Sequence, residues 1–176
     1  MITNTQIHNA RNTIAKGAVD AGFDYVLWLD SDMVFDRDIL KRLLDDVDGR
    51  DYVTGLCFRR SENSLPCIYS DLRWSVDGGE VKTSADVLSD YPRDALFEVA
   101  GSGFACVITS TALLAYMIEI FGAPFFPLMG MGEDMTFCFR ARQVGYKMFC
   151  DSRIKIGHIG KRIFDESYYF GYKNPT

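Results

Sequence analysis

Two aspartates that end an apolar run have the clearest potential for chemistry in this sequence. In "DYVLWLDSDMVF", residues 24–35, Asp30 and Asp32 flank Ser31 directly after an apolar stretch. Such a stretch predicts a buried strand, and open α/β sheets bind ligands beyond the carboxyl ends of their strands. Two carboxylates there repel each other, which a bound divalent cation reverses. The pair predicts a Mg²⁺ or Mn²⁺ site, with Asp32 as the direct ligand and Asp30 accepting hydrogen bonds from a sugar or a metal-bound water.

Position distinguishes this pair from other pairs of the same spacing. The sequence contains three Asp-x-Asp patterns: Asp30 with Asp32, Asp36 with Asp38, and Asp46 with Asp48. The second lies at a predicted helix start, where carboxylates accept from free amides and favour the helix dipole. The third falls in a turn that ends the same helix. Both have structural explanations, so the first pair is the candidate for chemistry.

Alternating helices and strands must position these residues. The predicted helices span residues 7–21, run from a cap at Asp36 to Gly49, from a cap at Ser110 to about Phe121, and from near Glu133 to Gly145. The predicted strands are 24–29, "DYVTGLCF", "FACVIT", "KMFCD" and "IKIGH", with a hairpin turn at "VDGGEV". Short links in the first half predict an α/β fold with a mostly parallel, Rossmann-like sheet and helices on both faces. Residues 67–109 are expected to add antiparallel or mixed strands.

Composition bounds the class of protein. The chain has 176 residues, 48% of them hydrophobic, so we expect one globular domain over 1–176. Its net charge is -5 and its basic residues are scattered, which argues against nucleic acid as the main partner. Five cysteines without a Cys-x-x-Cys pair indicate reduced, buried thiols. No apolar run reaches the roughly 20 residues of a membrane span and no signal peptide is evident, so we expect a cytoplasmic protein.

Four segments in a fixed order carry a family resemblance. They are "YVLWLDSDMVF", "GSGFACVIT", "MGEDMTFCFRARQVGYKMFCD" and "IKIGHIG". Together they resemble a family-2 type glycosyltransferase with the GT-A (nucleotide-diphospho-sugar transferase) fold, of the sort common in bacteria and phages. The resemblance covers about residues 9–160. It implies a transferase that moves a sugar from a nucleotide-diphosphate donor, such as a UDP- or GDP-sugar, to a hydroxyl acceptor, with inversion.

The resemblance also implies roles for particular residues. Asp30-Ser31-Asp32 is the metal and nucleotide-sugar motif, and His158 completes the metal site as a neutral imidazole ligand. Glu133 binds acceptor hydroxyls and Asp134 is the base that takes the acceptor's proton. The resemblance further implies the following donor-binding residues: Arg11 beside the nucleotide, and Gly101, Ser102 and Gly103 under the sugar.

Each of these residues also has a purely structural interpretation. Glu133 and Asp134 suit the first turn of a helix, His158 suits a strand end, and Arg11 suits an exposed helix face. The "GSG" segment suits a bend between strands.

Two other functions stay open at this stage. A sugar-phosphate nucleotidyltransferase also uses a metal at a sheet edge, but it leaves "GED" and His158 unexplained. A non-catalytic, truncated glycosyltransferase-like domain is the alternative from another class. The first strand and loop of the family, which hold the base and much of the ribose, are not in this sequence. We therefore expect an N-terminally truncated fold whose exposed sheet edge supports a homo-oligomer.

Overall fold

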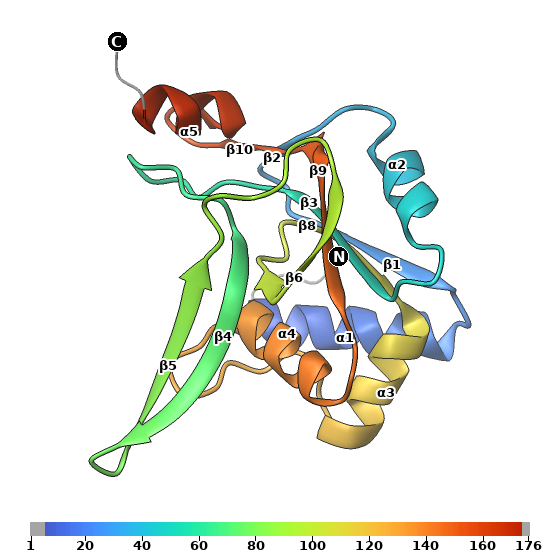
Figure 1. Cartoon of the computed structure of the whole chain (residues 1–176). Helices are drawn as coiled ribbons and strands as arrows, with labels where there is room; N and C mark the ends of the chain where they lie inside the picture. The colour runs from blue at the N-terminus through green and yellow to red at the C-terminus, as the bar shows by residue number, and fades with distance from the viewer. Residues whose placement is uncertain (1–5, 174–176) are drawn as a thin grey trace.

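A five-stranded sheet forms the centre of the computed structural model, which describes residues 6–173 (Figure 1). Its strand order is β1-β8-β3-β9-β6. These strands are β1 (Tyr25–Leu29), β8 (Cys106–Ser110), β3 (Tyr52–Leu56), β9 (Met148–Lys155) and β6 (Leu96–Val99). The helices are α1 (Ile7–Asp20), α2 (Ile39–Asp46), α3 (Thr111–Phe121), α4 (Glu133–Gln143) and α5 (Glu166–Lys173).

Antiparallel pairing dominates this sheet. Strand β8 runs antiparallel to both of its neighbours, β1 and β3, and β6 runs antiparallel to β9. Only β3 and β9 pair in parallel. The prediction of a mostly parallel, Rossmann-like sheet covered by helices on both faces is therefore wrong in its strand directions, and the fold is mixed α/β. The prediction failed because the alternation of helices and strands does not reveal that β8 lies between β1 and β3 and runs antiparallel to both.

The central strands are buried on both sides, and β1 is not. All five residues of β3 and of β8 are buried. In β1 only Trp28 is buried, while Tyr25 is 38% exposed, although its sequence is just as continuously apolar. Within residues 6–173, no strand pairs with the outer edge of β1. An apolar run therefore indicated a strand here without indicating how far it is covered.

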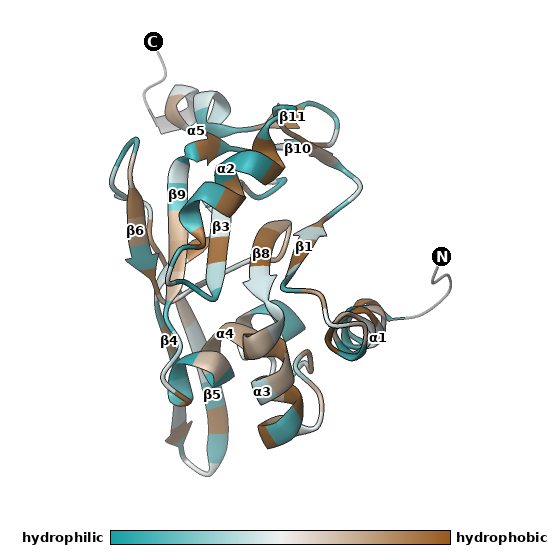
Figure 2. Ribbon diagram, turned by 90° about the vertical axis from the view of Figure 1, so that its right-hand side faces the viewer, coloured by the Kyte–Doolittle hydropathy of each residue, from teal (hydrophilic) through white to brown (hydrophobic). Residues whose placement is uncertain are grey.

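Alternate residues of the central strands point into two apolar clusters. On one side, Tyr52 and Val107 join residues of α1, α3 and α4. On the other side, Val53 and Ile108 join residues of α2. Figure 2 shows hydrophobic and hydrophilic residues together along α1 and α2, as expected for helices that cover a sheet with one side only. The sheet is thus the layer that both clusters share.

A second sheet of strand order β5-β4-β7 extends beside α4. It consists of β4 (Ile68–Asp77), β5 (Glu80–Val87) and β7 (Gly101–Ser102). Strands β4 and β5 form a long antiparallel hairpin that projects from the rest of the molecule (Figure 1). Its two-residue turn, Gly78-Gly79, has φ values of 59° and 85°, which glycine adopts without strain. This confirms the hairpin predicted at "VDGGEV" and the antiparallel character of the middle segment.

Two predicted helix caps have different outcomes. Ser110 caps α3 as predicted, because its Oγ accepts from the Leu113 backbone N–H at 3.0 Å. Asp36 does not cap α2, because the helix begins at Ile39. The residue at its N-cap position is Asp38, whose side chain makes no capping hydrogen bond. The Asp38 carboxylate accepts instead from Arg42 Nε at 2.9 Å. Asp38, at the start of the helix, thus forms an ion pair with Arg42 one turn later and does not cap the helix.

A small third sheet joins the segment after β1 to the end of the chain. Its order is β11-β10-β2, with β2 (Met33–Val34), β10 (Gly157–Ile159) and β11 (Ile163–Phe164). Strands β2 and β10 are antiparallel, with His158 opposite Met33. The Ile159 N–H also donates to the Asp32 carbonyl at 2.8 Å. This pairing brings residues 32 and 158 together from opposite ends of the sequence.

The structure bears on two expectations from composition. All five cysteines are free thiols, and four of them are buried. In the part of the chain that the structure describes, the helices are too short or too polar to cross a membrane.

Candidate functional site

The predicted metal pair lies at the end of β1, on the side where β2 begins. Asp30 is fixed through its backbone, whose N–H donates to the Ala105 carbonyl at 3.0 Å. The side chains of Asp30 and Asp32 are 41% and 36% exposed, and Ser31 lies in the exposed turn between them. Burial is the main cause that raises the pKa of Asp30, while Arg11 opposes the rise and Asp32 adds to it. The carboxylates therefore lie at the surface, close enough to influence each other.

Arg11 connects this pair to the predicted acceptor residues. Its side chain on α1 is only 9% exposed, and its Nη1 donates to Glu133 Oε1 at 2.8 Å. Its Nη2 lies 3.5 Å from Asp30 Oδ1. The guanidinium also lies over the Phe104 ring, 5.2 Å from the ring centroid. A buried cation between two carboxylates fixes both of them, so the exposed-helix interpretation of Arg11 is wrong.

His158 lies directly beside Asp32. Its Nδ1 is 3.1 Å from the Phe58 carbonyl oxygen and its Nε2 is 3.3 Å from Asp32 Oδ2. A carbonyl oxygen only accepts, so Nδ1 carries the proton in the first contact. In a neutral imidazole, Nε2 then presents a lone pair to a carboxylate oxygen. Two acceptors then face each other, and Arg60 Nη1, 3.0 Å from the same Asp32 Oδ2, supplies part of the positive charge that favours this contact.

This arrangement fits the requirements of a divalent cation in part. A metal-binding histidine commonly donates its second N–H to a carbonyl, as Nδ1 does to Phe58 here. Within residues 6–173, no group of three or more His, Cys, Asp or Glu side chains is arranged to hold a metal ion. Mg²⁺ and Mn²⁺ commonly take only one or two protein ligands and complete their shell with substrate phosphate and water. Asp32 and His158 could therefore hold such an ion together with a ligand, and Asp30 is instead directed toward Arg11.

Asp134 occupies a more enclosed position at the start of α4. Its Oδ1 accepts from the Met135 backbone N–H at 2.7 Å, and its Oδ2 lies 3.8 Å from where a side chain at Gly103 would begin. A side chain at Gly132 would begin 2.9 Å from Oδ1, so the glycine of "GED" leaves room for this carboxylate. Burial raises the pKa of Asp134, Glu133 adds to the rise and Arg11 opposes it. A raised pKa makes a carboxylate a better proton acceptor at neutral pH.

The predicted "GSG" segment divides between the core and the site. A side chain at Gly101 would begin 2.8 Å from Cys138 Cβ, so this glycine is needed for the packing of β7 on α4. Ser102 is 1% exposed and its Oγ lies 2.7 Å from the Tyr52 hydroxyl. Of the three residues, only Gly103 lies beside Asp134. Gly101 and Ser102 therefore belong to the packed core beneath the site, and neither lies beside the Asp134 carboxylate.

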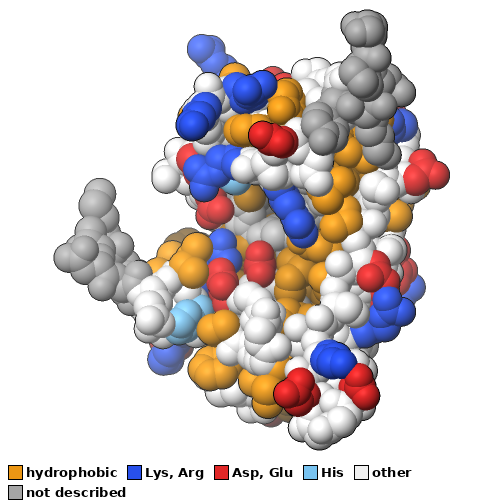
Figure 3. All heavy atoms as spheres, turned by 90° about the vertical axis from the view of Figure 1, so that its left-hand side faces the viewer, with side chains coloured by type: hydrophobic (Ala, Val, Ile, Leu, Met, Phe, Trp, Pro, Cys, Tyr) orange, Lys and Arg blue, Asp and Glu red, His pale blue; other side chains and the backbone are white. Residues whose placement is uncertain are grey.

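Sequence reasoning missed the segment that follows β3. The Phe58 carbonyl sets the proton position of His158, and Arg60 Nη1 lies 3.0 Å from Asp32 Oδ2. Arg59 turns the other way and donates to the Tyr69 hydroxyl at 2.8 Å. Two consecutive arginines directly after a buried strand were a usable signal, since β3 ends at the same edge as β1. Figure 3 shows acidic and basic side chains gathered around a hollow on this face, with apolar side chains between them.

The described residues thus define a mixed α/β fold with an antiparallel-dominated central sheet, and carboxylates, arginines and a histidine from several elements lie near the end of β1. Neither a protein-family model nor a curated protein matches the chain. The solved structure described as "Crystal Structure of A197 from STIV" is similar in fold, with a TM-score of 0.63 and 17% sequence identity. The alignment covers 90% of this chain and 70% of that one. At this identity, the similarity concerns the fold alone.

Proposed function

We propose that this chain is a metal-dependent glycosyltransferase that moves a sugar from a nucleotide-diphosphate donor, a UDP- or GDP-sugar, to a hydroxyl acceptor with inversion. The observation that carries the proposal is the contact between His158 Nε2 and Asp32 Oδ2 at 3.3 Å, which places an imidazole nitrogen and a carboxylate oxygen side by side just beyond the end of β1. It lies beside the carboxylates that Arg11 holds. The ordered motifs of the sequence, which resemble those of family-2 type glycosyltransferases, add support from an independent direction.

Mn²⁺ or Mg²⁺ bound at Asp32 and His158 would neutralise the charge that develops on the leaving diphosphate. Asp30, 41% exposed, keeps an oxygen available for donor hydroxyls, because Arg11 approaches only one side of its carboxylate. Arg11 itself balances the negative charge of Asp30 and Glu133. This balance lowers the repulsion that an incoming diphosphate would otherwise meet.

Asp134 is the proposed general base. In the proposed step, the acceptor oxygen forms a bond to the anomeric carbon while the bond from that carbon to the diphosphate oxygen breaks. The proton of the acceptor hydroxyl passes to Asp134 Oδ2, which faces the open side of Gly103. Glu133, held by Arg11 at 2.8 Å, orients the acceptor by accepting from a neighbouring hydroxyl. A single displacement of this kind inverts the configuration of the anomeric carbon.

One observation favours a second function, a non-catalytic assembly domain. The outer edge of β1 has no partner strand within residues 6–173, and Tyr25 at its start is 38% exposed. Such edges recruit further strands, here from a second copy of the chain.

The free thiols of all five cysteines support a reducing compartment, and we propose a cytoplasmic location on that basis.

A thermal-shift panel tests the proposal. UDP, GDP, CDP and dTDP are each added with and without Mn²⁺, because a ligand that binds the native state raises its melting temperature. We expect one nucleotide to stabilise the protein only in the presence of the metal, and the matching nucleotide sugar to be turned over. Light scattering on the same samples reports self-association. Stabilisation by none of the nucleotides would leave the assembly function as the better explanation.

A further inference from the structure

A cavity of about 500 Å³ lies directly beside Asp32. Its walls come from the segment after β3 and from the hairpin and helix near the end of the chain. They include Arg60, Glu62, Lys161, Arg162, Phe164 and Tyr168. Arg60 belongs to both places, because its Nη1 lies 3.0 Å from Asp32 Oδ2. The cavity thus shares Arg60 with the surroundings of Asp32, and none of the proposed catalytic carboxylates lines it.

Lys161 and Arg162, the two other cations of the cavity, lie in a hydrogen-bonded turn. Lys161 and Arg162 form the tip of the β10–β11 hairpin, which the Gly160 N–H closes by donating to the Arg162 carbonyl at 2.9 Å. A side chain at Gly160 would begin 2.9 Å from the Phe164 ring and 3.4 Å from Arg60 Cδ. This turn therefore requires glycine, and its close fit to Phe164 and Arg60 holds the hairpin tip against the cavity.

Arg60 pairs with Asp32, but the other two cations of this cavity have no ion-pair partner among the described residues. In the described part of the chain, neither Lys161 nor Arg162 forms an ion pair with a carboxylate. Glu62 is the one acidic residue among the lining side chains. The Arg162 guanidinium lies over the Tyr168 ring at 5.2 Å, a contact that uses its face and leaves its N–H edge available. Three cations around one cavity are unusual for a chain of net charge -5.

We infer that this cavity is a subsite for a phosphate group, held by Arg60, Lys161 and Arg162. Arginine edges match phosphate oxygens in paired hydrogen bonds, and a lysine adds a mobile positive charge. Two ligands of the proposed reaction could supply that phosphate: the diphosphate of the donor or a phosphorylated acceptor. The choice between these sources rests on the proposed function, whereas the anion site itself does not.

Calorimetric titration with inorganic pyrophosphate in the presence of EDTA tests the subsite without a metal. The double variant Lys161→Gln/Arg162→Gln is compared with the control Lys16→Gln/Lys147→Gln, which removes the same charge at exposed, paired lysines elsewhere. We expect the first variant to lose affinity on the order of tenfold and the control to lose less than about twofold, because charged hydrogen bonds to the pyrophosphate are lost only in the first. Equal affinities of the two variants, or no binding by the unaltered protein, would overturn the subsite.

The variants are expected to fold, because Lys161 and Arg162 are exposed at a hairpin tip. The single variant Lys161→Gln is a milder change, and it should also weaken pyrophosphate binding, by less than the double variant does. Steady-state kinetics then identifies the source: a raised KM for the nucleotide sugar assigns the subsite to the donor, and a raised KM for a sugar phosphate assigns it to the acceptor. Pyrophosphate binding that depends on Arg162 without any sugar transfer would retain the subsite and reject the proposed function. Sugar transfer together with an unchanged pyrophosphate affinity of the double variant would retain the proposed function and reject the subsite.

Discussion

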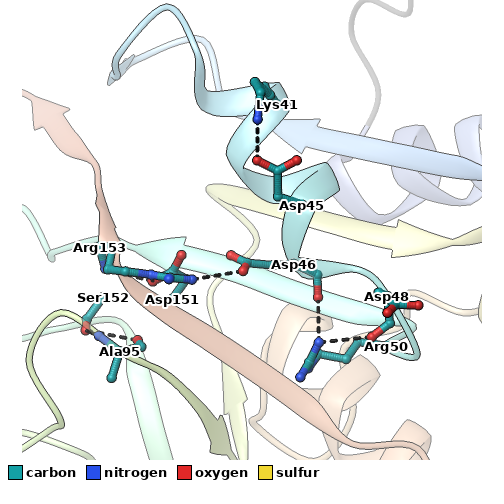
Figure 4. Close-up of polar contacts among 9 residues, drawn as sticks. All are labelled: Lys41, Asp45, Asp46, Asp48, Arg50, Ala95, Asp151, Ser152 and Arg153. Carbon is teal, nitrogen blue, oxygen red and sulfur yellow. Dashed lines mark hydrogen bonds and ion pairs between the residues drawn. The ribbon is translucent and has the colours of Figure 1, made fainter.

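Two groups of acidic side chains in this molecule contain an arginine, and they are built differently. The first lies on the open face and consists of Asp30, Asp32, Glu133 and Asp134 around Arg11. The second lies between α2 and β9, where Arg153 Nη2 lies 2.9 Å from Asp46 Oδ1 and Arg153 Nε donates to Asp151 Oδ1 at 2.8 Å (Figure 4). Both contain more carboxylates than cations, so charge alone does not distinguish them.

The difference lies in whether the protein itself can satisfy the excess charge. In the second group, the carboxyls can take up a proton as the pH falls toward 6: burial raises the pKa of Asp46 to about 6, and the neighbouring Asp151 carboxylate adds to the rise. In the first group, His158 Nδ1 faces the Phe58 carbonyl, so a neutral ring presents a lone pair to Asp32, and the half-exposed Arg60 is the nearby cation. We propose that a ligand completes this first group, whereas the second group needs none.

The largest effect is expected from Asp134→Asn. This change keeps the shape and the hydrogen bond from the Met135 N–H but removes the proton acceptor. We predict that turnover of the nucleotide sugar falls about 10²–10⁴-fold, the usual contribution of a general base, while donor affinity changes little. Initial rates over a range of donor concentrations separate the two quantities. Unchanged turnover would reassign Asp134 to the structural role of ending the "GED" loop.

The next largest effect is expected from Asp32→Ala. Supporting residues of a metal site change its affinity 10–100-fold, so removal of a direct ligand should weaken Mn²⁺-dependent nucleotide binding by at least about 100-fold. The matched control is Asp38→Ala, whose carboxylate pairs only with the half-exposed Arg42 and does not cap α2. We predict no loss of binding and less than about 0.5 kcal/mol of destabilisation for the control. Calorimetry with and without Mn²⁺ provides the measurement, and equal losses in both variants would remove the distinction between the aspartate pairs.

Arg11→Gln should affect stability more than any change at an exposed cation. The Arg11 side chain is 9% exposed, and its loss leaves Glu133, 17% exposed, without its partner. Breaking a buried ion pair costs about 3–5 kcal/mol, which partial exposure of Asp30 reduces here to roughly 2–3 kcal/mol. Lys16→Gln, which breaks a pair exposed on both sides, should cost less than about 0.5 kcal/mol. Urea unfolding of both variants measures the free energies, and similar values for the two would show that Arg11 is not a structural clamp.

Local elements of the fold could be predicted from the sequence, but the order of strands could not. Periodicity and turn residues located α1, α3, α4 and the Gly78-Gly79 hairpin close to where they lie. The insertion of β8 between β1 and β3 depends on pairings such as Tyr25 with Ser110 and Tyr52 with Thr109, between segments far apart in the sequence, for which no local pattern exists. The continuous apolar runs of β1 and β3 were alike, yet only β3 is buried throughout.

The part of the candidate site that the sequence predicted consists of residues that belong to the quoted motifs. Asp30, Asp32, Glu133, Asp134 and His158 do gather on one face as the motif order implied. The contribution of Phe58 was not predictable, because it acts through its backbone carbonyl. The two arginines after β3 marked this edge of the sheet, but not the contact of Arg60 with Asp32. Asp46 was interpreted as an ordinary turn residue, since nothing in the sequence reveals that Asp151 lies beside it.

The smallest effect is expected at the second group, where Asp46→Asn should change how stability depends on pH. Asp46 Oδ2 is buried and accepts no hydrogen bond from the described residues, so a proton on this carboxyl turns it into a donor toward Asp151. The pKa of Asp46 is about 6 in the folded protein and 3.8 ordinarily, so folding favours the protonated form. The stability it contributes is complete below pH 4 and is lost as pH rises through 6.

The asparagine amide donates to Asp151 at every pH, and this gain is offset in part by the loss of the ion pair with Arg153. We therefore predict that Asp46→Asn is about 1 kcal/mol more stable than the unaltered protein at pH 8, a value discounted for solvent screening, and similar in stability at pH 4. The matched control is Asp45→Asn on the same helix, whose carboxylate is 60% exposed and pairs with Lys41. It should leave the pH dependence between 4 and 8 unchanged. Urea unfolding at several pH values decides the matter: parallel pH profiles for Asp46→Asn and the unaltered protein would mean that the second group holds no shared proton.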